Sequence, residues 1–205
     1  MAEITNIVKS GKDKYSVYID NEFSCFLTSE TIVKNSFKIG QFIDQSQIET
    51  AQFENEKLTA FDRAIKYLSA IKSEKQVKDY LYSKGYGKKI VDFVINKLKE
   101  YNYVNDEIFA KMYIQNYQTK KGKKLLIFEL ETKGISKEII SNLLEDFDDN
   151  LECMRLLAEK FLRNKPRDKK TAIKLSNHLF SKGYTYDKIN IILKEFIYNF
   201  DAEEN

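Results

Sequence analysis

Three short segments of the chain match one another: Leu81-Tyr82-Ser83-Lys84-Gly85-Tyr86, Leu130-Glu131-Thr132-Lys133-Gly134-Ile135 and Leu179-Phe180-Ser181-Lys182-Gly183-Tyr184. Both intervals between their glycines are 49 residues. Similar segments at one fixed period are typical of tandem repeats, in which each repeat is one supersecondary unit. The chain is therefore predicted to contain three copies of one unit.

Each segment has the pattern of a helix end that is closed by glycine. Glycine adopts the left-handed conformation just beyond a helix, where a Cβ atom would clash. In a Schellman cap, the third position from the helix end contacts the second position beyond it. These positions are apolar in all three copies, which pair Leu81 with Tyr86, Leu130 with Ile135 and Leu179 with Tyr184. We therefore predict a Schellman cap in every repeat.

Another helix is expected directly after each cap. Ser136 and Thr185 are good N-cap residues, and Gly87 is the weaker equivalent in the first repeat. Beyond each glycine, apolar residues return at the spacing of one helix face. They are Val91, Val94, Ile95 and Leu98, then Ile140, Leu143, Leu144 and Phe147, then Ile189, Ile192, Leu193 and Phe196.

Two further helices are expected upstream of each cap. In the first repeat, Thr59-Ala60-Phe61-Asp62 is predicted to open one helix, and Ser73-Glu74-Lys75-Gln76 is a capping box for the next. Asn105 and Asn150 can cap the first helices of the later repeats. The acidic pairs Asp106-Glu107 and Asp148-Asp149 lie where helices begin, so the helix dipole accounts for them without a metal ion. Each repeat is thus predicted to be a three-helix unit that resembles a helix-turn-helix.

Residues 1–50 have a different pattern. Ile4–Val8, Tyr15–Ile19 and Phe23–Leu27 are rich in β-branched and aromatic residues, and Asp20-Asn21 suits a tight hairpin turn. A short helix is expected before Gly40. The predicted fold is mainly α, with three tandem three-helix repeats after a small β-rich N-terminal module.

The predicted boundaries follow from these patterns. They are 1–50 for the β-rich module, 51–57 for a linker or part of a helix, 58–104, 105–148 and 149–200 for the three repeats, and 201–205 for an acidic tail.

Composition limits the classes of function. The chain contains 13 Tyr and 14 Phe, so it can form a core although 32% of its residues are charged. It has one His, His178, and neither G-x-x-x-x-G-K-[ST] nor G-x-G-x-x-G, so metal sites, most acid–base catalysis and nucleotide binding lack support. We expect no enzymatic activity, no metal and no cofactor.

The expected location is the cytoplasm. The first residues show no signal-peptide pattern, and no apolar run is long enough for a membrane span. Cys25 and Cys153 have no paired spacing, which favours free thiols in a reducing compartment. No membrane partner is expected.

The formal net charge of +3 is distributed unevenly. Residues 1–56 contain 5 basic and 9 acidic side chains, residues 63–137 contain 17 and 8, and residues 138–205 contain 11 and 13. A positive centre indicates contact with a polyanion or an acidic protein surface. A solvated lysine-rich surface accounts for the charge equally well.

The sharpest local feature is Lys120-Lys121-Gly122-Lys123-Lys124, expected in the exposed connection between the first two helices of the middle repeat. These lysines are candidates for contact with phosphates or acidic protein groups, with a solvated loop as the alternative. The full set of candidates is Lys88, Lys89, Lys120, Lys121, Lys123, Lys124, Arg163, Lys165, Arg167, Lys169 and Lys170.

Several segments resemble those of a known family. Tyr103-Val104-Asn105-Asp106-Glu107-Ile108-Phe109-Ala110, followed by Lys121-Gly122 and by Glu129–Ile135, resembles the central signature of the RecX family. Ala64–Leu68, Ser73-Glu74 and Leu81–Tyr86 are similar to that family's first repeat. The β-rich start, with Tyr18–Phe23, is similar to the N-terminal extension of Gram-positive members. The resemblance covers essentially the whole chain.

The resemblance implies that the three-helix repeats form an elongated curved array. It also implies a monomeric regulator that binds in the groove of a RecA–DNA filament. Such proteins inhibit the ATPase, strand-exchange and co-protease activities of RecA and so modulate DNA repair and the SOS response. Weak, non-specific DNA binding would also fit. The chain departs from the family at Lys123-Lys124, where many relatives have a Gly-Pro or Arg-rich version, so the contacts of this segment stay open.

The alternative function is a DNA-binding protein of the helix-turn-helix type, because each repeat has a tight turn before its third helix. Against it, the third helix of the middle repeat is expected to expose Glu138, Glu145 and Asp146, which phosphates would repel. The chain also has only four Arg, the residue most used to read guanine.

Overall fold

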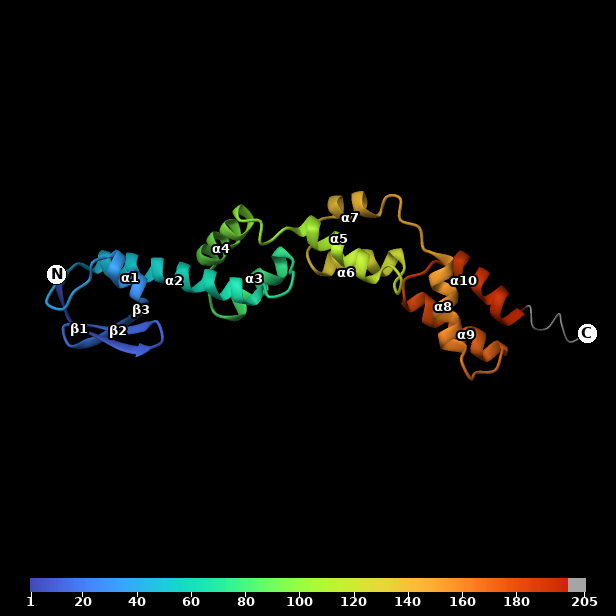
Figure 1. Cartoon of the computed structure of the whole chain (residues 1–205), viewed down its shortest axis with the longest axis horizontal. Coiled ribbons are helices and arrows are strands. Elements are labelled where there is room, and N and C mark those ends of the chain that lie inside the picture. Colours follow the sequence, from blue (N-terminus) through green and yellow to red (C-terminus); the bar gives the residue numbers. More distant parts are fainter. Residues whose placement is uncertain (199–205) are drawn as a thin grey trace, which may run out of the picture. The chain divides into compact units, whose positions relative to one another are not determined.

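The computed structural model describes residues 1–198, which form a small N-terminal sheet and ten α-helices, the first of them between the third and fourth strands (Figure 1). The predicted acidic tail and residues 199–200 of the third repeat lie outside the described residues. The structure divides into two compact units. One consists of Met1–Ala70 with Val77–Tyr103, and the other of Ile71–Gln76 with the residues from Val104 on.

The N-terminal sheet is antiparallel and has the strand order β3-β2-β1-β4. Its strands are β1 (Ala2–Gly11), β2 (Lys14–Ile19), β3 (Glu22–Leu27) and β4 (Phe42–Ile43). Asp20 and Asn21 have φ values of 50° and 67°, the two positive values that a type I′ turn needs, so the predicted hairpin is confirmed. One face of the sheet forms a core with the short helix α1 (Ser29–Lys34) and with the first turns of α2 (Gln45–Tyr67).

Helix α2 begins much earlier than the sequence indicated. Asp44 and Gln47 form a capping box at its N-terminus, which fixes the start 14 residues before Thr59. The hydroxyl of Thr59 instead donates to the carbonyl oxygens of Asn55 and Glu56. The predicted helix start at Thr59 is therefore wrong, and residues 51–57 are helical.

The remaining helices form triplets, as the repeat predicts. The first triplet consists of the end of α2, α3 (Glu74–Ser83) and α4 (Lys88–Glu100). The second consists of α5 (Asp106–Tyr117), α6 (Lys123–Thr132) and α7 (Lys137–Leu144). The third consists of α8 (Leu151–Leu162), α9 (Lys169–Ser181) and α10 (Tyr186–Leu193), which a π-helical turn, η1 (Lys194–Tyr198), continues.

All three predicted Schellman caps are present. Gly85, Gly134 and Gly183 have φ values of 86°, 85° and 89°. Each glycine N–H donates to the carbonyl oxygen three residues earlier. The backbone N–H of the residue after each glycine donates to the leucine carbonyl oxygen, at 3.3 Å for Tyr86–Leu81, 3.1 Å for Ile135–Leu130 and 3.4 Å for Tyr184–Leu179. These two bonds define the motif, so the repeat is a structural one.

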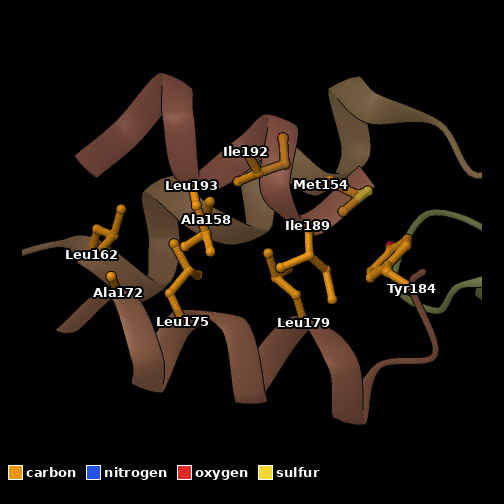
Figure 2. Close-up of a cluster of buried hydrophobic side chains, with 10 residues drawn as sticks. All are labelled: Met154, Ala158, Leu162, Ala172, Leu175, Leu179, Tyr184, Ile189, Ile192 and Leu193. Carbon is orange, nitrogen blue, oxygen red and sulfur yellow. The ribbon is translucent and has the colours of Figure 1, made fainter. Parts of the chain in front are cut away.

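The third triplet shows how each repeat forms its own core. In Figure 2, Leu175 and Leu179 of α9 face Ala158 of α8 and Ile189 of α10, and Tyr184 lies at one end of the cluster. Leu175, Leu179 and Ile189 are completely buried. Burying such a side chain contributes roughly 1.5–3 kcal/mol. The periodic apolar positions therefore hold the three helices together.

Two of the glycine turns also form contact surfaces. A Cβ atom on Gly183 would lie 2.5 Å from the Cβ of Leu125 in the first turn of α6, and one on Gly134 would lie 2.6 Å from the Cβ of Lys75 in the first turn of α3. At both places a hydrogen bond reaches the turn: Gly122 N–H donates to Lys182 O at 2.8 Å, and the Ser73 hydroxyl donates to Lys133 O at 2.7 Å. The first turn of the second helix thus packs on the glycine turn of the following repeat.

The acidic pairs complete these two junctions. Asp149 accepts a hydrogen bond from the backbone N–H of Lys123 at 2.7 Å, and Asp106 accepts one from Glu74 at 2.8 Å. The sequence assigned these pairs to the helices that directly follow them. Asp106 and Glu107 do lie in the first turn of α5, and Asp148 and Asp149 directly precede the N-cap of α8. In addition, one carboxylate of each pair caps the second helix of the preceding repeat.

Candidate functional site

The Lys120–Lys124 segment connects α5 with α6, as predicted. Lys120 and Lys124 are exposed, and Lys123 is half-buried at the first position of α6. Gly122 precedes the helix as its N-cap, and its close contact with the Gly183 turn leaves no room for a side chain. The packing of Gly122 therefore determines where the neighbouring lysines lie.

Lys121 points into the protein. Its Nζ lies 2.8 Å and 2.7 Å from the two carboxylate oxygens of Glu129, and the Tyr113 hydroxyl donates to the same carboxylate at 2.7 Å. The amine also lies 4.0 Å from the ring centroid of Tyr117. Burial raises the pKa of Glu129, but the hydrogen bonds from Lys121 and Tyr113 outweigh it and hold that pKa below 4.5. Lys121 thus has internal partners that the sequence did not reveal.

A hollow of about 320 Å³ adjoins this segment on the same repeat. Its apolar lining comes from Ile127 of α6 and from Ile140 and Leu144 of α7. Charged side chains complete it: Lys123, Lys137, Glu131 and Glu145. Ile127 was not among the residues predicted from the sequence. Its apolar side chain lies outside the apolar positions that the repeats share, which could have indicated a contact other than the core of its own repeat.

The basic residues of the third repeat gather around the connection between α8 and α9. Lys160, Arg163, Lys165 and Arg167 line a hollow of about 550 Å³ together with Leu156, Glu159, Leu162 and Asn164. Arg163 and Lys165 are exposed, and the Lys165 Nζ lies 3.4 Å from the ring centroid of Phe161. Arg167 is partly buried and donates to the carbonyl oxygen of Phe196. The structure adds Lys160 to the predicted set.

Three pairs of adjacent lysines begin helices. Lys88-Lys89 lie in the first turn of α4, Lys123-Lys124 in that of α6, and Lys169-Lys170 in that of α9. None of these first turns contains an acidic residue. The positive end of the helix dipole disfavours a cation there by roughly 0.3–1 kcal/mol. The pairs therefore do not serve helix stability, and they add to a positive potential that favours anionic partners.

The described residues lack two other kinds of feature. Within residues 1–198, no group of three or more His, Cys, Asp and Glu side chains could hold a metal ion. In the same part of the chain, no helix is long and apolar enough to cross a membrane.

Comparisons with known proteins match this architecture. A family model described as the first three-helix domain of RecX matches residues 60–98, and one described as the second three-helix domain matches residues 105–144. The regulatory protein RecX of Clostridium acetobutylicum is 34% identical over 196 residues, which are 91% of this chain and 92% of that protein. This chain belongs to the RecX family. The RecX regulatory protein of Clostridium perfringens strain SM101 is 32% identical over 97% of this chain and 98% of its own length.

Solved RecX structures share the fold. The crystal structure of RecX from Lactobacillus salivarius is 27% identical, with a TM-score of 0.60 over 70% of this chain and 97% of that one. A second crystal structure of a RecX regulatory protein has a TM-score of 0.66 over 94% of this chain at 22% identity. The resemblance to RecX and the mainly helical fold with three-helix domains are therefore confirmed.

Proposed function

We propose that this RecX protein binds the RecA–DNA filament and inhibits its ATPase, strand-exchange and co-protease activities. Through that inhibition it modulates DNA repair and the SOS response, acting as a monomer in the cytoplasm. Membership of a family of regulatory proteins supports this role. The structural observation that carries it is the recurrence of lysine pairs at the N-termini of α4, α6 and α9.

The lysine pairs suit a repeated and negatively charged target. Exposed amines near a helix N-terminus add their charge to the positive end of the helix dipole, which favours carboxylates and phosphates. Asp149 and Asp168 already accept hydrogen bonds from backbone N–H groups at α6 and α9, so the lysine side chains supply the contacts at those two helices. A nucleoprotein filament presents such groups at regular intervals. Because each of the three repeats has one pair, the chain can make similar contacts at several points.

The contact surface that we propose consists of the exposed members of the predicted set. They are Lys88, Lys89, Lys120, Lys124, Arg163, Lys165, Lys169 and Lys170, with Lys123 at the edge of the α6–α7 hollow. Lys121 and Arg167 contribute mainly to internal packing, because both are partly buried and hydrogen-bonded within the protein.

The test is the rate of ATP hydrolysis by RecA on single-stranded DNA, measured with the chain at near-stoichiometric ratios. The wild-type chain should slow hydrolysis. A variant that combines Lys120→Ala, Lys124→Ala, Lys169→Ala and Lys170→Ala should need about tenfold more protein for the same inhibition. Its unfolding temperature should stay unchanged, because these four side chains are exposed.

The matched control combines Lys111→Ala with Lys174→Ala, which removes exposed lysines from the same α5–α6 and α9 regions but not from a helix N-terminus. This control should inhibit like the wild type. Failure of the wild-type chain to slow hydrolysis would contradict the proposed function. Tight binding to one duplex sequence over random competitor DNA would instead support a helix-turn-helix reader.

A further inference from the structure

The outer face of the N-terminal sheet has aromatic side chains where polar ones are usual. Val17 and Leu27 lie on the inner face, where they are almost completely buried against α1 and α2. On the other face, Val8 lies opposite Ser16 and Ser16 lies opposite Phe26. Antiparallel sheets with one solvated face normally alternate apolar and polar residues, so exposed rings on this face require an explanation.

Three rings gather on this outer face. Asn6, Tyr18 and Phe23 form the next row across the strands. Phe23 is 51% and Phe26 is 44% exposed. The centroid of the Phe23 ring lies 4.9 Å from that of Phe26 and 6.0 Å from that of Tyr18. The rings therefore form one continuous surface, which we call the aromatic face (Tyr18, Phe23 and Phe26).

A cation is part of the aromatic face. The Nζ atom of Lys14 lies 3.5 Å from the centroid of the Phe26 ring. Lys12 is exposed in the adjoining turn of the β1–β2 hairpin, whereas Lys9 lies in register with Tyr15 and Leu27 of the inner face. The carboxylate of Asp13, at the same hairpin, accepts hydrogen bonds from Ser29. The hairpin end of the face is thus positively charged, with stacking and phosphate-binding groups side by side.

The positions in register with the rings have no negative charge. They are Asn6, Val8 and Ser16. The nearest acidic residues of the hairpin turn, Asp20 and Glu22, lie at the opposite end of the strands from Lys12 and Lys14. The end of the face at Lys12, Lys14 and Phe26 therefore favours a flexible polyanion that also carries flat apolar groups.

We propose that the aromatic face binds single-stranded nucleic acid by stacking bases on Phe23, Phe26 and Tyr18 while Lys12 and Lys14 contact phosphates. Base–aromatic stacking beside basic side chains is the physical basis of sequence-tolerant binding to single strands. A duplex offers its phosphates but keeps its bases stacked inside, so it can use only the lysines. This site is separate from the lysine pairs of the repeats, and its test does not depend on RecA.

The first experiment introduces a reporter. The chain contains no Trp, so Phe23→Trp gives a single indole on the aromatic face. Addition of a 20-nucleotide oligo(dT) to the full-length variant should quench the indole fluorescence, because a base stacks on the ring. Inorganic polyphosphate and a duplex of equal length should quench it much less. The control variant is Phe180→Trp, at a site of similar exposure on α9, which oligo(dT) should not quench.

The second experiment removes stacking but keeps an apolar side chain. The double variant Phe23→Leu with Phe26→Leu should bind fluorescein-labelled oligo(dT) at least about tenfold more weakly than the wild type in fluorescence anisotropy, because stacking is lost at two bases. Its affinity for duplex DNA and its unfolding temperature should stay close to wild-type values. Phe180→Leu is the matched control and should bind like the wild type.

Several outcomes would overturn the proposal. One is unchanged oligo(dT) affinity in the double variant, and another is no binding of oligo(dT) by the wild type. Sedimentation that shows a wild-type dimer and a monomeric double variant would assign the face to a second copy of the chain. None of these outcomes depends on ATP hydrolysis by RecA, so they are distinguishable from a failure of the proposed function.

Discussion

Gly183 is required for two reasons, its backbone conformation and its close contact with Leu125. Its φ of 89° is unfavourable for any side chain, and the atoms of Leu125 occupy the place of a Cβ. Gly85 has the same φ requirement, but no described atom lies within 4 Å of the place where its Cβ would be. Gly87 needs neither, because its φ is −73° and the surrounding space is open.

These differences predict an order of stabilities. Gly85→Ala should lower the free energy of unfolding by about 1–2 kcal/mol through the left-handed backbone alone. Gly183→Ala should cost more, because the backbone of α6 must also move, and Gly87→Ala should have little effect. Thermal unfolding of the three variants tests the order. If Gly85→Ala and Gly183→Ala lowered the free energy of unfolding equally, the close contact with Leu125 would not contribute to the cost of the substitution.

The ion pair between Lys121 and Glu129 should make the stability of the protein depend on pH. Removing the amine by Lys121→Ala leaves the half-buried carboxylate of Glu129 without its cation, so the variant should be about 1–3 kcal/mol less stable at pH 7. The folded pKa of Glu129 lies below 4.5, so the stabilisation from this pair is present above that pH and is lost as the pH falls through the lower folded value.

The difference between the wild type and Lys121→Ala should therefore shrink in acid. Denaturant titrations at pH 7 and at pH 3 measure it. Lys120→Ala is the matched control, since Lys120 is an exposed neighbour in the same connection. A difference that stays constant between the two pH values would rule out the ion pair as its cause.

At the scale of elements, the first turn of α6 depends on a carboxylate outside its own repeat unit. Asp149 is 6% exposed and accepts from the Lys123 N–H, whereas its neighbour Asp148 is exposed and pairs with Lys188. Loss of a capping side chain costs roughly 0.5–2 kcal/mol, and loss of an exposed ion pair costs roughly 0–1 kcal/mol.

Asp149→Ala should therefore destabilise the protein and speed hydrogen exchange at the first amides of α6, from Lys123 to Leu126. Asp148→Ala should leave that exchange near its wild-type rate. Hydrogen exchange read by NMR distinguishes the two variants. If both variants sped hydrogen exchange at the first amides of α6 equally, the Asp149 carboxylate would not be the specific cap of that helix.

The elements that could be predicted from the sequence are those with local causes. The caps at Gly85, Gly134 and Gly183 depend on residues within one turn, and the helix faces depend on a spacing that the chain repeats. The start of α2 was not predicted, because Thr59 is itself a common N-cap residue and the capping box of Asp44 and Gln47 was not considered.

The candidate site was only partly predictable. The exposure of Lys120 and Lys124 followed from their place in a polar connection. The internal role of Lys121 did not, because Glu129 reaches it only after the chain turns between α5 and α6. The cap that Asp149 places on α6 requires the third repeat to be docked, which no local pattern encodes.

The molecule as a whole has two kinds of proposed binding surface. The repeats provide similar charged helix N-termini, and the sheet provides the aromatic face. The hydrophobic cores of the N-terminal module, the second repeat and the third repeat are separate clusters. Binding by the lysine pairs and binding by the aromatic face should therefore be separable by mutation. Each set of variants should leave the other activity intact.

Electron cryo-microscopy of RecA filaments decorated with the chain would show whether the repeats bind there. We expect ordered density for the repeats on the filament, with the first turns of α4, α6 and α9 facing RecA side chains or DNA phosphates. Density in which all three N-termini face solvent would contradict this expectation, as would filaments that stay bare at a stoichiometric excess of the chain.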